Sequence, residues 1–282
     1  MNFQNKTQLV LVFSILILSI LQSSCNKENN NVNINGQLVT GTVTDTDGNI
    51  YKTIKIGNQW WMAENLKVRH YRNGDSITNL DTIIGQSLKL NSQKWKAELS
   101  GGYSIKSSTN ASNGYLYNFY AIADTRNIAP EGWRVPSDED WKELEIFLGM
   151  EKSVAEKVNW RGTNQGNKLK IQNYSGVSGF AWKNPIGENA EAIDVVTNPK
   201  YEIWGTNESG FCALPAYYVM FDGTLANDAQ TCCFLWTSSS QGNGGWYRYL
   251  DYNKINVFRY YGPASYGFCI RCVRDVVENE NN

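Results

Sequence analysis

The last third of the chain alternates between apolar and polar residues, and this pattern predicts strands. Apolar-rich runs recur about every ten residues, the spacing of a meander. Asp222-Gly223 and Asn253-Lys254 lie between runs as turn signals. We therefore expect an antiparallel sheet, built from the segments 210–220, 232–240, 245–252, 255–261 and 267–275.

The segment 41–66 predicts a hairpin followed by a third strand. Asp47-Gly48 is a strong two-residue turn signal, and Gly57-Asn58 marks the next turn. A calcium loop beginning at Asp45 would need an acidic residue at position 56, which is Ile56. The acidic residues near this turn therefore favour a turn over a metal site.

The middle of the chain predicts two helices. One follows from an apolar stripe within 113–124, and the other spans 138–148 with Ser137 as N-cap and Gly149 as stop. Acidic residues in the first turn of the second helix indicate capping rather than catalysis. Its expected buried face consists of Trp141, Leu144, Phe147 and Leu148.

These patterns predict an α+β fold with two helices, an antiparallel sheet and long irregular loops. We expect a single domain over residues 41–276, with a long irregular insertion over 67–113 and a polar tail over 277–282. The one histidine, His70, has no ligand-spaced partner and favours a surface position. We expect neither a metal nor a cofactor.

The N-terminus predicts export. Residues 1–24 have the form of a signal peptide, with an uncharged apolar run from Leu9 to Leu21 that is too short to span a bilayer. The residues before Cys25 resemble a lipobox, although Gln22 stands where leucine is usual. We expect Cys25 to be lipidated and residues 25–40 to form a flexible, Asn-rich tether.

The expected location is the outer membrane, on the cell surface or the periplasmic face, with the membrane as a partner through the lipid anchor. The pair Lys27-Glu28 resembles the charged export signal of surface lipoproteins in Bacteroidota. The chain has 26 basic and 27 acidic residues, a net charge of −1, which gives no electrostatic basis for binding nucleic acid.

Several blocks of the chain resemble one known family. They include "APEGWRVPSDEDW", "SGFCALPAYY", "LWTSSS" and the run from Trp246 to Asp275. In this order they resemble the Fibrobacter succinogenes major paralogous domain family over nearly all of 41–275. The resemblance implies a C-type-lectin-like fold, related to that of formylglycine-generating enzymes, and leaves the ligand undefined.

Two departures from related patterns narrow the expectations. Ala129 stands where many members of the family have a cysteine, the natural partner of Cys272, so that bridge cannot form. The calcium-binding tripeptides of sugar-binding C-type lectins are also missing. Binding of a sugar through calcium is therefore disfavoured.

The Cys-x-x-Cys formed by Cys269 and Cys272 raises three possibilities: a redox pair, half of a metal site, or two structural thiols. Residues three apart in a strand point to opposite faces, so we expect structural thiols, with Cys272 on the apolar face of Phe268 and Ile270. Cys212 and Cys269 both follow Gly-Phe and are the first choice for a disulfide. A second possibility is a bridge from Cys232 or Cys233 to Cys272.

The sequence leaves three functional hypotheses. The first is a lipid-anchored binding module that recognises a glycan or another extracellular ligand, such as a protein. The others are an enzyme, either a formylglycine-generating type of oxidase or a glycosidase, and a structural or adhesion component. Aromatic rings with interspersed polar groups are typical of sugar sites, although about half of the rings in an alternating hairpin must face the core. The candidate ligand residues are Trp246, Arg248, Tyr249, Asp251, Tyr252, Arg259 and Tyr260.

Overall fold

The two turn signals near the N-terminus form the predicted hairpin in the computed structural model of the protein. Strands β1 (Thr40–Thr44), β2 (Ile50–Ile56) and β3 (Gln59–Met62) are antiparallel neighbours. The Asp45 carboxylate accepts the backbone N–H groups of Asp47 and Asn49, each at 2.9 Å. Asp45 therefore stabilises the turn, as the sequence predicted.

The structure describes residues 37–84, 87–105, 114–172, 182, 205–226 and 231–277. The predicted signal peptide, the lipidation site Cys25, most of the tether and most of the polar tail lie outside the described residues.

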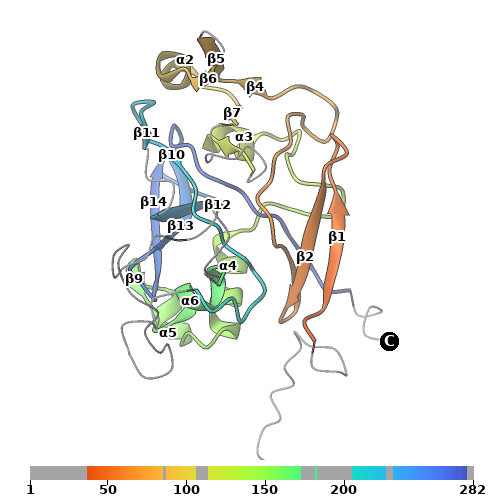
Figure 1. The fold of residues 1–282 in the computed structure, drawn as a ribbon, viewed down its shortest axis with the longest axis vertical. Coiled ribbons are helices and arrows are strands. Elements are labelled where there is room, and N and C mark those ends of the chain that lie inside the picture. Colours follow the sequence, from red (N-terminus) through yellow and green to blue (C-terminus); the bar gives the residue numbers. More distant parts are fainter. Residues whose placement is uncertain are drawn as a thin grey trace, which may run out of the picture.

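The predicted C-terminal meander is confirmed for three strands. These are β12 (Cys232–Gln241), β13 (Gly244–Asp251) and β14 (Val257–Pro263), and β9 (Asn159–Arg161) extends the sheet in the order β12-β13-β14-β9. The last predicted strand behaves differently. It touches β12 only through an isolated bridge between Cys269 and Leu235, and its end, β15 (Val273–Asp275), pairs with β3. The C-terminal segment thus connects the two four-stranded sheets, which lie on opposite sides of the molecule (Figure 1).

The predicted central helix is α4 (Asp138–Phe147). Ser137 and Asp140 form a capping box, in which the Asp140 N–H donates to Ser137 Oγ at 3.1 Å and the Ser137 N–H donates to Asp140 Oδ2 at 2.7 Å. Trp141 and Leu144 are fully buried. Leu148 is buried as well, whereas Phe147 is only partly buried, so the expected inner face is confirmed for three of its four residues.

The other expected helix is shorter than its pattern suggested. Helix α3 (Phe119–Ala123) begins after the cap Asn118, whereas Leu116 belongs to strand β8 (Leu116–Tyr117). The described residues also contain three helices that were not predicted: α2 (Ser92–Ala97), α5 (Lys152–Ala155) and α6 (Gln165–Leu169).

The interval expected to be irregular contains short strands. The described part of this interval holds β4 (Thr78–Asn79), β5 (Asp81–Ile84), β6 (Ser87–Leu90) and β7 (Gly102–Ser104). Strands β4, β7 and β8 form one small sheet, β5 and β6 a second, and β10 (Tyr218–Val219) and β11 (Leu225–Ala226) a third. The fold is thus mixed α+β, with several small sheets and few helices.

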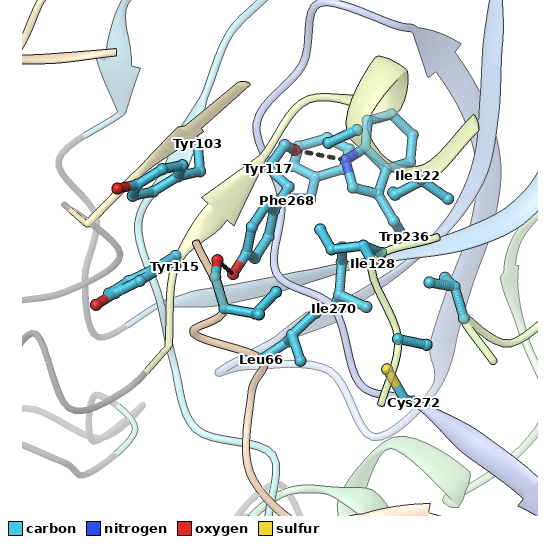
Figure 2. Packing of buried hydrophobic residues seen from close by; sticks show 14 of the residues in the cluster. Leu66, Tyr103, Tyr115, Tyr117, Ile122, Ile128, Trp236, Phe268, Ile270 and Cys272 are labelled. Atoms are coloured by element: carbon cyan, nitrogen blue, oxygen red, sulfur yellow. Dashed lines mark hydrogen bonds between the residues drawn. The ribbon is translucent and has the colours of Figure 1, made fainter. Parts of the chain in front are cut away.

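Two clusters of buried side chains form the core, and the C-terminal segment contributes to both. Phe268, Ile270 and Cys272 belong to the first cluster, where the Trp236 indole donates to the Tyr117 carbonyl at 2.9 Å (Figure 2). Cys269 belongs to the second cluster. Strand-like alternation therefore directs consecutive side chains of one segment into separate parts of the core.

No helix among the described residues is long and apolar enough to cross a membrane.

Candidate ligand-binding face

The sheet β12-β13-β14-β9 has two chemically different faces. One face packs against α4 and carries charged groups that pair with each other. Arg248, which is fully buried, donates from Nε to Glu145 Oε1 at 2.8 Å and from a terminal nitrogen to Asp138 Oδ1 at 2.7 Å. Arg259 donates to Asp138 Oδ2 at 2.7 Å, and Arg161 donates to Glu145 Oε2 at 2.5 Å. This paired-charge face therefore belongs to the core.

Burial and ion pairing act in opposite directions on Asp138. Desolvation favours the neutral acid, but the hydrogen bonds from Arg259 and the charge of Arg248 outweigh it and lower the pKa of Asp138 to about 2. Desolvation lowers the pKa of Arg161 to about 10. The carboxylates of α4 therefore do more than cap the helix, because they hold the arginines of the sheet.

These contacts correct the sequence interpretation of Arg248 and Arg259. Both were candidate ligand residues, but both are buried and satisfied by α4 carboxylates. Binding a ligand to either guanidinium would require breaking a buried ion pair. Trp246 lies on the same face, with the Arg259 guanidinium 4.0 Å from its ring centroid.

The opposite face carries a row of aromatic residues that runs across the strands. The register pairs Trp160 of β9 with Phe258 of β14, Phe258 with Tyr249 of β13, and Tyr249 with Phe234 of β12. All four side chains are partly exposed. Because each residue is directly opposite the next, the rings form one continuous cross-strand row.

The row continues beyond the four strands. The Phe268 ring lies 4.8 Å from the Phe234 ring, and the partly exposed Tyr218 ring lies 4.5 Å from Phe234. We call the set from Trp160 to Tyr218 the aromatic row. It consists of Trp160, Phe258, Tyr249, Phe234, Phe268 and Tyr218.

Ring orientation differs between the centre and the ends of the row. Phe234 and Tyr249 stack with a 2° interplanar angle and a centroid distance of 4.3 Å, so each covers a face of the other. Trp160 is inclined by 51° to Tyr249, and Tyr218 by 46° to Phe234. The ends of the row are therefore better placed than its centre to offer a ring face to a ligand.

The remaining predicted site residues have mixed positions. Tyr249 lies in the aromatic row, and its hydroxyl donates to the carboxylate of Asp251, whose other oxygen accepts the Asn253 N–H at 2.9 Å. Tyr260 is 36% exposed and stacks on Tyr261. Tyr252 is partly buried against the second core cluster.

Five members of the row were not singled out from the sequence, among them Phe258, which lies in the predicted strand 255–261. Tyr218, Phe234 and Phe268 lie in segments that were predicted as strands, and Trp160 lies in a segment with no clear pattern. The pairing register brings Phe234, Phe258 and Trp160 together with Tyr249, and ring contacts with Phe234 add Phe268 and Tyr218. Alternation within each strand could have indicated which of its rings share a face. No signal in the sequence indicates the order of the strands.

The turn between β13 and β14 is held from inside by a lysine. Lys170 is buried, and its Nζ donates to the carbonyls of Asp251 at 3.0 Å and Lys254 at 2.9 Å. Burial lowers the pKa of Lys170 to about 7. These contacts give Lys170 a structural role next to Asp251.

The five described cysteines are all free thiols, so the expected bridge between Cys212 and Cys269 is not present. Cys212 has a left-handed backbone with φ 56°, and its Sγ accepts from the Asn207 side chain at 3.1 Å. Cys269 and Cys272 face different core clusters, and burial raises the pKa of both thiols. This arrangement agrees with a structural role for the Cys-x-x-Cys.

The remaining candidates from the sequence are a metal site and the histidine His70. The described residues contain no group of three or more side chains suited to hold a metal ion. His70 is partly exposed, and its Nδ1 lies 2.5 Å from Asp47 Oδ1 in the turn region of the first hairpin. The predicted surface position of His70 is thus confirmed.

Comparison with known proteins yields one result. The chain matches no curated protein and no solved structure. The family described as the Fibrobacter succinogenes major domain matches residues 54–274, which include both four-stranded sheets apart from β1, the first part of β2 and the end of β15. The chain therefore belongs to the Fibrobacter succinogenes major domain family.

Proposed function

We propose that the protein is a binding module that recognises an extracellular glycan through the aromatic row. The observation that supports this function is the register that places four partly exposed rings side by side across one face of the sheet, with the partly exposed Tyr218 ring against the last of them, Phe234. Aromatic rings pack against the apolar C–H faces of sugars, while tyrosine hydroxyls and backbone groups bind sugar hydroxyls.

The proposed setting is the outside of a bacterial cell. In this proposal Cys25 carries a lipid, the tether separates the domain from the outer membrane, and the fold is of the C-type-lectin-like type without calcium. A soluble ligand or a neighbouring cell-wall polymer would then reach the aromatic row directly.

A binding role fits the chemistry better than catalysis. The acidic residues of α4 that could serve a hydrolase are already paired with arginines of the core. The cysteines that could serve an oxidase are buried, and burial raises the pKa of Cys233 to about 12. Neither the α4 carboxylates nor these cysteines are positioned to meet a substrate, so we favour recognition without turnover.

An array of immobilised glycans tests the proposal. The purified protein should bind at least one class of glycan saturably, and Trp160→Ala should weaken that binding. Trp246→Ala is the matched control, because it removes the same side chain from the paired-charge face of the same sheet. Equal loss in both variants, or binding that neither variant changes, would contradict a site on the aromatic row.

A further inference from the structure

We infer that the ligand of the aromatic row is an uncharged, linear polysaccharide chain that lies across the strands. This inference rests on the proposed function and specifies the ligand class of the same face. Two independent observations support it: the distribution of charge between the two faces of the sheet, and the length and direction of the row.

The four strands contribute almost no charge to the face that carries the row. The arginines of β9, β13 and β14 all point to the opposite face, where α4 carboxylates neutralise them. On the row side, Asp251 is the only charged side chain that the four strands contribute.

Asp251 is also not available as a strong ligand group. Its carboxylate already accepts the Tyr249 hydroxyl and the Asn253 N–H. Among the side chains that the four strands contribute, an anionic polymer would therefore meet no cation, and a cationic one would meet a single, occupied carboxylate. The charge of this face therefore matches an uncharged ligand.

The length of the row excludes a compact ligand as its full occupant. The ring centroids of Trp160 and Tyr249 lie 5.1 Å apart and those of Tyr249 and Phe234 lie 4.3 Å apart, so the Trp160 and Phe234 rings are at most 9.4 Å from each other. The row then continues past Phe268 to Tyr218, since Gly267 bridges to Val219. A single sugar ring covers only one part of this distance, whereas an extended chain contacts both ends.

The direction of the row and the ring tilts agree with such a chain. The inclined rings, Trp160 and Tyr218, stand at opposite ends of the row, and the stacked pair of Phe234 and Tyr249 stands between them. A linear chain that crosses the strands would pack a sugar against each inclined end. Its middle would pass over ring edges and the Tyr249 hydroxyl.

Titration calorimetry with the full-length protein in detergent tests this inference. The probes are neutral gluco-, xylo- and manno-oligosaccharides, each from the monosaccharide to the hexasaccharide, together with oligogalacturonate as the anionic counterpart. For one neutral series, affinity should rise with chain length, and the Kd should be unchanged between low and high salt. Oligogalacturonate should bind more weakly than that series.

Variants at the two ends locate the chain. Trp160→Ala and Tyr218→Ala should each weaken hexasaccharide binding by about tenfold, the effect expected for removing one stacking contact. A disaccharide should respond to one of the two variants and not to both. Tyr218→Leu, which keeps apolar volume, replaces Tyr218→Ala if the latter melts at a lower temperature, and Trp246→Ala should leave the Kd unchanged.

Several results would overturn the inference while leaving a glycan-binding function intact. They are equal affinity for the monosaccharide and the hexasaccharide, tighter binding of oligogalacturonate with a strong salt dependence, or loss of hexasaccharide binding in only one end variant. Failure of every glycan on the array and in the series would instead contradict the proposed function itself. Self-association that Trp160→Ala abolishes in sedimentation would show that a second copy of the chain occupies the row.

Discussion

The two faces of the sheet β12-β13-β14-β9 are built from the same strands but from opposite chemistry. Towards α4 the strands present Arg161, Arg248 and Arg259, all buried and paired. Away from α4 they present aromatic rings, most of them partly exposed. Three arginines of the sheet are thus buried, whereas several of its aromatic rings reach the solvent, which is the opposite of what is usual for these residue types.

This reversal separates stability from recognition within one strand. Arg248 and Tyr249 are consecutive, yet Arg248 connects the sheet to α4 and Tyr249 belongs to the aromatic row. Buried charges are retained only when they are well paired, and large exposed apolar surfaces usually indicate a binding site. Substitutions on the two faces should therefore have different consequences.

The largest effect on stability should come from Arg248→Ala. The substitution leaves the Glu145 and Asp138 carboxylates without one of their partners in a site closed to water. Removing one partner of a buried ion pair typically costs about 3–5 kcal/mol. Denaturant unfolding of the purified protein measures the change.

Arg134→Ala provides the control for this substitution. Arg134 also binds two carboxylates, Asp140 and Asp275, but its side chain is 41% exposed. Exposed pairs typically contribute about 1 kcal/mol or less. If the two variants lose the same free energy of unfolding, the buried network is not the main connection between α4 and the sheet.

Acidification should weaken the same network of ion pairs, and it should lower the free energy of unfolding by less than Arg248→Ala does. The pKa of Asp138 is about 2 in the folded protein, against about 3.9 for an aspartate in an unfolded chain. Because the unfolded state takes up the proton first, the stabilisation is complete above pH 4 and falls as the pH drops towards 2. Its full size is about 2.6 kcal/mol.

Comparison of wild type with Asp138→Asn isolates this contribution. The variant should be less stable near neutral pH, and its stability should fall less steeply over the acid range. Parallel curves for the two proteins would show that Asp138 is not the carboxylate that titrates. The measurement is the free energy of unfolding at a series of pH values.

Local rules were enough to predict the helix cap and the hairpin turn, and insufficient for either face of the sheet. The cap at Ser137 and the turn at Asp47-Gly48 depend on neighbours in sequence, and both are present in the structure. The pairing of Arg248 with Asp138 joins residues 110 positions apart, and Trp160 enters the sheet beside β14 from a distant segment. Such contacts depend on strand order and register, which one sequence with no alignment does not encode locally.

The cap of α4 should contribute less than the network it supports. Ser137→Ala removes the acceptor for the Asp140 N–H at the start of the helix that carries Asp138 and Glu145. Loss of such a cap typically costs about 1 kcal/mol. Thermal unfolding measures it, and Ser137→Thr, which keeps a hydroxyl, should recover most of the loss.

The smallest effect should come from Tyr260→Ala, which tests the contrast between the two faces at a single position. Tyr260 is 36% exposed and lies beside the row, with its ring stacked on the exposed Tyr261 at 4.9 Å. Its removal should change the free energy of unfolding by about 0.5 kcal/mol or less, as is usual for surface positions. Arg259→Ala, one residue away on the other face, removes three hydrogen bonds to Asp138 and should cost several times more. Denaturant unfolding measures both losses. Equal losses in the two variants would mean that the exposed rings also stabilise the fold. The aromatic face would then be part of the core and would not be open to a ligand.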